Sequence, residues 1–435
     1  MGFAQGVSGL NASASNLDVI GNNIANSGTI GFKSGSVQFS DVYAGSRVGL
    51  GAEVAGVSQN FSAGAVQTSS RALDVAITNG DGLFRLASPG GEIAYSRNGQ
   101  FNMDKSGFIV NSGGYQLTGY PVGASGAVAG GSPAPLQLPT SAMAPKPTGK
   151  VTAQFNLDSR SVPPTAAPFD STNSATYNYA NAVTMFDSLG NSHELSTFFV
   201  KTGSNAWQVY ATADGFPLDK TGAKATSPAA KPIAEPLSYK TFTATSSSLS
   251  FDTSGALVKP VDTAPDPDIT MPVKLEFAGL NFGNGSSNMN FTVDVTGTTQ
   301  FGNANEVNKL TQNGYTSGVL SSFAIEQDGT VTGKYSNEQT QALGKIVLSS
   351  FMNPNGLKSL GGNLWTETAA SGGPLTGSPG DGTKLGGLTS GAVEASNVDL
   401  TSELVNLIIA QRTYQANAQT VKTQDQVLQT LVNLR

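Results

Sequence analysis

The chain has 435 residues, of which 12% are charged and 38% hydrophobic, and its net charge is −6. This length allows two or three domains with separate cores. The absence of a Lys/Arg-rich run argues against nucleic-acid binding, and the absence of cysteine excludes disulfides, thiolate zinc sites and a cysteine nucleophile. The sequence contains no stretch of about 20 apolar residues, so it predicts no membrane-spanning helix.

The first 25 residues predict an α-helix that carries one apolar stripe. Its members recur at steps of four and three, the spacing of a coiled-coil seam. They are Phe3, Val7, Leu10, Ala14, Leu17, Gly21 and Ile24. We predict that the larger of them form the N-terminal packing seam: Phe3, Val7, Leu10, Leu17 and Ile24.

The middle of the chain predicts two β domains, one inserted in the other. Residues 26–70 predict an extended connector: Asn26–Gly35 is rich in Gly, Ser and Thr, and Val37–Phe61 alternates short apolar runs with Gly, which predicts irregular strands. Period-two alternation begins near Arg71, and the short strands and Gly-containing turns that follow are typical of a sandwich or barrel. The predicted segments are 71–145 and 301–361 for the first β domain, 146–300 for the inserted outer β domain, and 362–396 for a second, flexible connector.

Residues 397–435 predict a long C-terminal helix, because they contain neither Gly nor Pro. Either Asn397 or Asp399 could cap its first turn. At 1.5 Å per residue the helix would be roughly 50 Å long. A second heptad stripe follows the cap, comprising Leu404, Leu407, Gln411, Tyr414, Ala418, Val421, Asp425, Leu428 and Val432. Its candidate packing residues are Leu404, Leu407, Tyr414, Val421 and Leu428.

Two interpretations of the paired helices remain open. They could form an intramolecular two-helix stalk, or a core that is complete only when it packs against other copies of the chain. Gln411 and Asp425 would weaken an isolated pair, and the N-terminal helix has little apolar area, which favours the second interpretation. The predicted fold class is therefore mainly β with α-helical termini that form a coiled-coil-like core, and with two nested β domains.

No residue pattern predicts an active site. The single histidine, His193, lies next to Glu194, and a solvated histidine in a turn is the favoured interpretation over a catalytic dyad. Asp262, Asp266 and Asp268 lack the spacing of a calcium loop, and no glycine-rich phosphate motif occurs. We therefore expect no catalytic residue, no cofactor and no metal, and a function that resides in surfaces.

Two terminal stretches resemble the flagellar axial proteins, the family of rod, hook and hook-associated proteins. The run NLDVIGNNIANSGTIGFK (Asn16–Lys33) resembles their N-terminal signature, and the segment that starts at Ala395 resembles their C-terminal signature. Gly28, Gly31 and Phe32 match the signature after the first helix, where the chain would reverse. Ser96–Pro121 and Tyr335–Phe351 resemble the hook proteins of this family.

The resemblance implies a structural subunit that polymerises into a flexible tube, with its terminal helices around a central channel. Such a tube would act as a universal joint that transmits motor torque from rod to filament. The implied partners are other copies of the chain, the distal rod, hook cap and hook–filament junction proteins, and the flagellar type III export apparatus. The implied location is the extracellular hook, reached without a cleaved signal peptide, with no nucleic acid bound and no membrane insertion.

Three alternatives accompany this interpretation. A distal rod protein of the flagellar basal body shares both terminal signatures but is expected to be much shorter around residues 150–300. An extracellular adhesin or binding module, with the coiled coil as its stalk, would carry a secretory signal, and none is visible. An enzyme acting on cell-wall polymers would need a carboxylate pair or a metal site.

Overall fold

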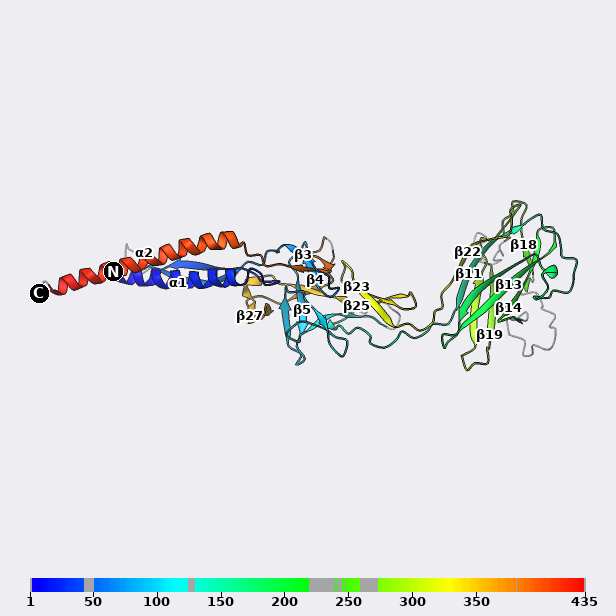
Figure 1. The fold of residues 1–435 in the computed structure, drawn as a ribbon, viewed down its shortest axis with the longest axis horizontal. Coiled ribbons are helices and arrows are strands. Elements are labelled where there is room, and N and C mark those ends of the chain that lie inside the picture. Colours follow the sequence, from blue (N-terminus) through cyan, green and yellow to red (C-terminus); the bar gives the residue numbers. More distant parts are fainter. Residues whose placement is uncertain are drawn as a thin grey trace, which may run out of the picture. The chain divides into compact units, whose positions relative to one another are not determined.

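The computed structural model describes residues 2–42, 51–123, 130–218, 239–240, 245–246, 248–258, 273–380 and 382–433. The fold is mainly β, with one long helix at each end of the chain (Figure 1). The chain forms two compact units. Unit 1 comprises Met1–Thr140, Leu320–Lys334 and Thr340–Arg435, and unit 2 comprises Ser141–Val319 and Tyr335–Gln339.

The terminal helices are α1 (Gly2–Ala25) and α2 (Leu400–Asn433), and they lie side by side and antiparallel in unit 1 (Figure 1). Asp399 is the N-cap of α2, because its Oδ1 accepts hydrogen bonds from the backbone N–H groups of Thr401 and Ser402. Asn397, the other predicted cap, instead accepts a bond from the Ser34 N–H and donates to the Asn60 carbonyl.

A β-hairpin occupies much of the segment that was expected to be an extended connector. Strands β1 (Gly35–Asp41) and β2 (Ala52–Gln59) pair antiparallel. Asn23 of α1 anchors the hairpin, since its amide exchanges two hydrogen bonds with the backbone of Gly35. The hairpin confirms the strands predicted over Val37–Phe61, and its ladder satisfies backbone groups that a wholly extended connector would leave to water.

The β part of unit 1 surrounds one apolar core that includes Phe84, Phe101 and Leu117, all fully buried. Its main sheet has the order β23-β24-β25-β9-β5-β6-β28-β27. The strands of this part are β3 (Val66–Thr68), β4 (Val75–Thr78), β5 (Leu83–Ala87), β6 (Ile93–Ser96), β7 (Asn102–Met103), β8 (Ile109–Val110), β9 (Gln116–Pro121), β10 (Ala134–Pro135), β23 (Leu320–Ile325), β24 (Thr330–Tyr335), β25 (Thr340–Ile346), β26 (Leu348–Ser350), β27 (Lys358–Gly361), β28 (Leu364–Thr366), β29 (Leu375–Gly377), β30 (Gly387–Ser390) and β31 (Ala392–Glu394). A single 3-10 turn, Pro354–Gly356, precedes β27.

The segment 362–396 is also structured, contrary to the prediction of a flexible connector. Strand β28 pairs with β6, β30 pairs with β4, and β31 pairs with β3. Trp365 and Leu388 are buried in this segment. Its glycines serve tight turns: Gly386 and Gly391 adopt positive φ angles, which other residues rarely do. The glycine content was therefore a sign of turns rather than of flexibility.

Unit 2 is built from two sheets that share one core, as in a sandwich. One sheet has the order β17-β16-β19-β20-β11-β21 with β22 paired to β11, and the other has the order β12-β13-β14-β15 with β18 paired to β14. The strands are β11 (Lys150–Asp158), β12 (Tyr179–Phe186), β13 (Ser192–Gly203), β14 (Ala206–Ala213), β15 (Phe216–Pro217), β16 (Tyr239–Lys240), β17 (Thr245–Ser246), β18 (Ser248–Ser250), β19 (Lys274–Leu280), β20 (Met289–Asp294), β21 (Thr299–Phe301) and β22 (Glu306–Gln312). A 3-10 turn, Ser174–Thr176, precedes β12.

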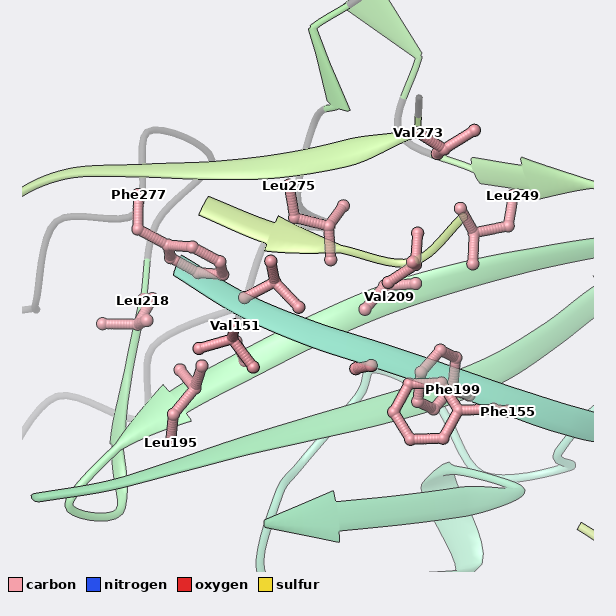
Figure 2. Close-up of a cluster of buried hydrophobic side chains, with 14 of the residues drawn as sticks. Val151, Phe155, Leu195, Phe199, Val209, Leu218, Leu249, Val273, Leu275 and Phe277 are labelled. Carbon is pink, nitrogen blue, oxygen red and sulfur yellow. The ribbon is translucent and has the colours of Figure 1, made fainter. Parts of the chain in front are cut away.

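Figure 2 shows side chains of both sheets pointing into the core of unit 2. Phe155 of β11 lies against Phe199 of β13, with ring centroids 5.0 Å apart. Strand β22 belongs to this unit, because it pairs with β11 and its Val307 packs against the same core. The structure therefore differs from the predicted return to the first β domain at residue 301.

Candidate self-assembly surface and its anchor

Glycine and polar residues form the contact line between α1 and α2, which we call the helix seam. A Cβ atom on Gly6 would lie 2.8 Å from Cγ2 of Val421, and one on Gly9 would lie 2.8 Å from Nδ2 of Asn417. Farther along, Nδ2 of Asn417 lies 3.5 Å from Oγ of Ser13, and Asn23 donates to Oε1 of Glu403 at 3.3 Å. The two backbones can approach this closely only because α1 has no side chain at two of these positions.

The predicted stripe of α1 lies one residue beyond the helix seam. Val7, Leu10 and Ile24 each follow a seam residue (Gly6, Gly9 and Asn23) by one position, a rotation of about 100° around the helix. The residues predicted to pack α1 against α2 therefore lie about 100° around α1 from the line along which the two helices actually meet. Four stripe residues are half-buried, Val7, Leu10, Leu17 and Ile24, and the Phe3 side chain is 47% exposed.

The predicted stripe of α2 is divided between two faces. Leu407 and Val421 are half-buried and lie on the side of the helix seam, with Leu407 between Glu403 and the buried Ala410. The other three predicted residues, Leu404, Tyr414 and Leu428, are exposed. The structure describes no side chain for Val432.

Sequence analysis missed a second group of exposed apolar residues on α2, comprising Val405, Ile408, Ile409 and Val427. Adjacent apolar pairs such as Ile408–Ile409 could have indicated this second apolar face from the sequence. Neighbouring residues of a helix point about 100° apart, so a single heptad stripe cannot contain both. Large apolar side chains exposed on several sides of one helix are typical of a surface that packs against another protein.

A buried charged triad anchors the segments that lead into both helices. Lys33 Nζ lies 2.6 Å from Glu394 Oε1, and Arg97 Nε lies 2.5 Å from Glu394 Oε2. The three side chains are at most 2% exposed. Burial lowers the pKa of Lys33 despite its carboxylate partner. Burial would raise the pKa of Glu394, but Arg97 and Lys33 outweigh it and hold this pKa below its ordinary value.

Backbone groups complete the triad and tie distant parts of unit 1 together. Lys33 also donates to the Ser62 carbonyl, and Glu394 Oε1 accepts the Gly64 N–H. The Arg97 guanidinium donates to backbone carbonyls in the β part, among them that of Gly80 at 3.0 Å. The triad thus joins the chain that leaves α1, the chain that enters α2, and the β part between them.

The signature residues after α1 lie beside this anchor. Gly31 has φ of +71°, and its N–H donates to the Glu394 carbonyl at 2.8 Å. A Cβ atom there would lie 2.6 Å from the backbone N of Asn98, so only glycine fits. The Phe32 N–H donates a hydrogen bond to the Thr29 carbonyl and so closes the turn. Gly28 has open space around it, and no contact requires glycine there.

His193 of unit 2 is not the solvated turn residue that was predicted. It lies on β13, its side chain is 10% exposed, and its ring stacks on Phe282 at 3.5 Å between centroids. Its Nδ1 is 2.8 Å from Asp214 Oδ2 and its Nε2 is 3.3 Å from Asp187 Oδ2. Glu194, the other half of the conceivable dyad, instead accepts from Ser196. The cluster holds together loops of unit 2 that are distant in sequence.

Replacing Asp187 by Asn is expected to destabilise unit 2 by about 1–3 kcal/mol at pH 7, because its buried carboxylate accepts several hydrogen bonds. Burial would raise the Asp187 pKa, but bonds from Asn191 and Asn284 outweigh it and keep this pKa well below its ordinary value. The stability it contributes is thus fully present above the unfolded pKa of about 4 and is lost as the pH falls through the lower, folded value.

Urea unfolding of the wild type and of the Asp187→Asn variant, each in a Trp365→Phe background and followed by the fluorescence of Trp207, measures the difference in the free energy of unfolding of unit 2. The measurement is repeated between pH 7 and pH 2. The wild-type advantage should shrink steadily below about pH 4. A difference that is the same at both ends of the range would show that the carboxylate charge contributes nothing.

Within the described residues, no group of three or more His, Asp or Glu side chains could hold a metal ion. Asp262, Asp266 and Asp268 lie outside the described residues. No helix in the described part of the chain is long and apolar enough to cross a membrane.

Four family models match the chain. Flagella basal body rod protein matches residues 5–33, flagellar hook protein FlgE/F/G D1 domain matches 76–153, flagellar basal body protein FlaE D2 domain matches 156–315, and flagellar basal body rod FlgEFG protein C-terminal matches 389–434. Together with the helical termini around a β fold, these matches define a flagellar axial protein of the rod and hook class.

Curated relatives narrow this class to one family. The chain is 46% identical to the flagellar hook protein FlgE of Escherichia coli and to that of Salmonella typhimurium, over the full length of both chains in each case. It is 31% identical to that of Borreliella burgdorferi over 99% of this chain and 98% of the relative. The chain belongs to the flagellar hook protein family and is a structural subunit of the hook. Membership implies self-polymerisation within the flagellum.

Proposed function

We propose that this subunit forms a flexible tube that acts as a universal joint and transmits motor torque from rod to filament. The observation that carries the proposal is the apolar surface that α1 and α2 leave exposed after pairing with each other. Leu404, Ile408 and Ile409 are between 45% and 57% exposed on α2, and Phe3 is 47% exposed on α1. Other copies of the chain would cover these side chains in a polymer.

In this proposal the predicted self-assembly residues have two roles. Leu407 and Val421 support the pairing of the two helices inside one subunit. The others face neighbouring subunits: Phe3, Val7, Leu10, Leu17, Ile24, Leu404, Tyr414 and Leu428. Gly31 and Phe32 set the chain reversal beside the charged triad, and the described contacts give Gly28 no defined part in it.

The proposal extends to the export of the subunit, to its partners and to what it does not bind. The subunit would leave the cell through the flagellar export apparatus and would meet the distal rod, the hook cap and the hook–filament junction proteins at the ends of the tube. It would bind no nucleic acid, insert in no membrane and catalyse no reaction.

Negative-stain electron microscopy of the purified full-length chain at raised salt tests the proposal. Curved or coiled tubes are expected, because salt strengthens the burial of apolar surface. Straight, rigid rods would favour the distal rod protein instead. A chain that stays monomeric under all these conditions would overturn the polymer proposal and revive the adhesin alternative.

A further inference from the structure

The dipeptide Asn-Gly occurs five times in the chain, at Asn79-Gly80, Asn98-Gly99, Asn284-Gly285, Asn313-Gly314 and Asn355-Gly356. Such a dipeptide can lose ammonia without an enzyme, because glycine has no side chain to hinder the attack of its backbone nitrogen on the preceding amide. The sequence therefore contains five chemically equivalent sites, and the fold around each of them decides which can react.

Four of the five glycines are packed tightly against other segments. They are Gly80, Gly99, Gly314 and Gly356. A Cβ atom at any of these positions would overlap an atom of a segment distant in sequence, for example the Val75 carbonyl oxygen in the case of Gly99. The reaction joins the glycine nitrogen to the asparagine side chain and so rotates the peptide bond between the two residues. Tight packing opposes this rotation at these four sites.

The fifth dipeptide, Asn284-Gly285, lies in the loop between β19 and β20 of unit 2. Both of its residues are exposed. A Cβ atom on Gly285, whose φ is +85°, would meet no other atom within 4 Å. The peptide bond between the two residues can therefore rotate without displacing a neighbouring segment.

Two hydrogen bonds hold the Asn284 amide beside the nitrogen that would attack it. Its Oδ1 accepts from the Ser286 N–H at 3.0 Å, and its Nδ2 donates to Oδ2 of Asp187 at 2.7 Å. The first bond spans Gly285 and so keeps Cγ of Asn284 near the Gly285 nitrogen. The same N–H group stabilises the negative charge that develops on Oδ1 when this nitrogen adds to Cγ.

From this arrangement we infer that Asn284 is a site of spontaneous deamidation in the folded protein, with water as the only co-reactant. The Gly285 nitrogen forms a bond to Cγ of Asn284, the Cγ–Nδ2 bond breaks, and the amide nitrogen leaves as ammonia with the proton that the Gly285 nitrogen loses. Water then adds across one of the two ring C–N bonds of the resulting succinimide, which opens to aspartate or isoaspartate. Neither step oxidises or reduces any atom.

Deamidation weakens the cluster around Asp187, because the new carboxylate has no hydrogen to donate. The Asp187 carboxylate, which is fully buried, thus loses one of its donors. The two carboxylates also repel each other across the former hydrogen bond. The loop between β19 and β20 is thereby released from the turn between β12 and β13, and unit 2 becomes less stable as the subunit ages.

Peptide mapping of the aged full-length chain by mass spectrometry tests the site. The purified protein is incubated at mildly alkaline pH, sampled over weeks and digested. Conversion at each Asn-Gly dipeptide is measured from the mass gain that accompanies replacement of an amide NH2 by OH. Asn284 should convert several-fold faster than the asparagine of any other Asn-Gly dipeptide. In guanidinium chloride, where the fold no longer distinguishes the sites, all five should convert at similar rates.

Urea unfolding of variants tests the consequence for unit 2, with the fluorescence of Trp207 as the signal in a Trp365→Phe background. Asn284→Asp should unfold at a lower urea concentration than its parent. The matched control is Asn288→Asp, which adds the same charge at another exposed position of the loop and should unfold like the parent. The aged parent protein should move toward Asn284→Asp in proportion to its conversion.

The inference is overturned if another Asn-Gly dipeptide converts first in the folded chain, or if Asn284 converts only after unfolding. Equal stability of Asn284→Asp and Asn288→Asp would show that the site does not act on the Asp187 cluster. None of these measurements depends on the formation of tubes, so their outcome leaves the proposed function unaffected.

Discussion

Replacing Glu394 by Gln is expected to lower the free energy of unfolding of unit 1 by about 3–5 kcal/mol. The carboxylate is the shared partner of two buried cations, Lys33 and Arg97. Gln keeps the shape of the side chain but not its charge. Lys33 can respond by losing its proton, whereas the guanidinium of Arg97 stays charged in proteins. An uncompensated charge would therefore remain in the interior.

The two tryptophans allow the change to be assigned to one unit. Trp365 lies in unit 1, where it contacts Phe61 and donates to Gln59, and Trp207 lies in the core of unit 2. Urea unfolding in a Trp207→Phe background, followed by the fluorescence of Trp365, reports on unit 1 alone. The Glu394→Gln variant should unfold at a distinctly lower urea concentration than its parent.

The matched control is Asp328→Asn, which removes a carboxylate from an exposed ion pair with Lys345 in the same unit. The Lys345 hydrogen bond lowers the pKa of Asp328 to about 2, but its side chain is 51% exposed. Such surface pairs contribute at most about 1 kcal/mol. Equal destabilisation by the two variants would show that burial of the triad adds nothing to its effect.

Replacing Leu407 by Asp is expected to abolish assembly while both β parts remain folded. Leu407 is half-buried on the side of the helix seam, between Glu403 and Ala410. A carboxylate there would lose solvation and sit beside the carboxylate of Glu403, so the helices would separate. Subunits without a paired helical core could not form the tube.

Pelleting of polymers measures assembly, and the fluorescence of Trp207 and Trp365 during thermal unfolding measures the fold of each unit. Gln415→Asp is the control, because it places the same charge at an exposed polar position of α2. The control should form tubes. A Leu407→Asp variant that loses its unfolding transitions together with assembly would contradict the prediction, since the β parts would then depend on the helices.

Much of the local structure was readable from the sequence because neighbouring residues determine it. The α1 and α2 boundaries were predicted to within a few residues from periodicity and from the N-cap carboxylate, which is Asp399. Gly-containing turns between short strands were also predicted, because glycine takes positive φ angles at little cost; the turn at Gly107, with φ of +87°, is one of them. The terminal signatures also indicated the family to which the chain belongs.

The register of the helix pair could not be predicted in the same way. The heptad pattern placed apolar residues in the seam of α1, whereas the structure places Gly6 and Gly9 there. Close approach of two backbones stabilises the pair through contacts that depend on the partner helix, and no periodicity within one helix reveals it. The same limit applies to α2. Leu404 and Leu407 were predicted to share one stripe, but Leu407 faces the helix seam and Leu404 is exposed.

The sequence by itself determined which segments are helical, where the turns lie and which family signatures the chain carries. Only the tertiary structure decided that the Gly- and Ser-rich segment 362–396 forms paired strands, and that Lys33 and Arg97 meet Glu394 across 361 and 297 residues of chain. The physical reason is the separation along the sequence over which each interaction acts. Helix and turn preferences act between residues a few positions apart, whereas the pairing of buried charges depends on which distant segments the core brings together.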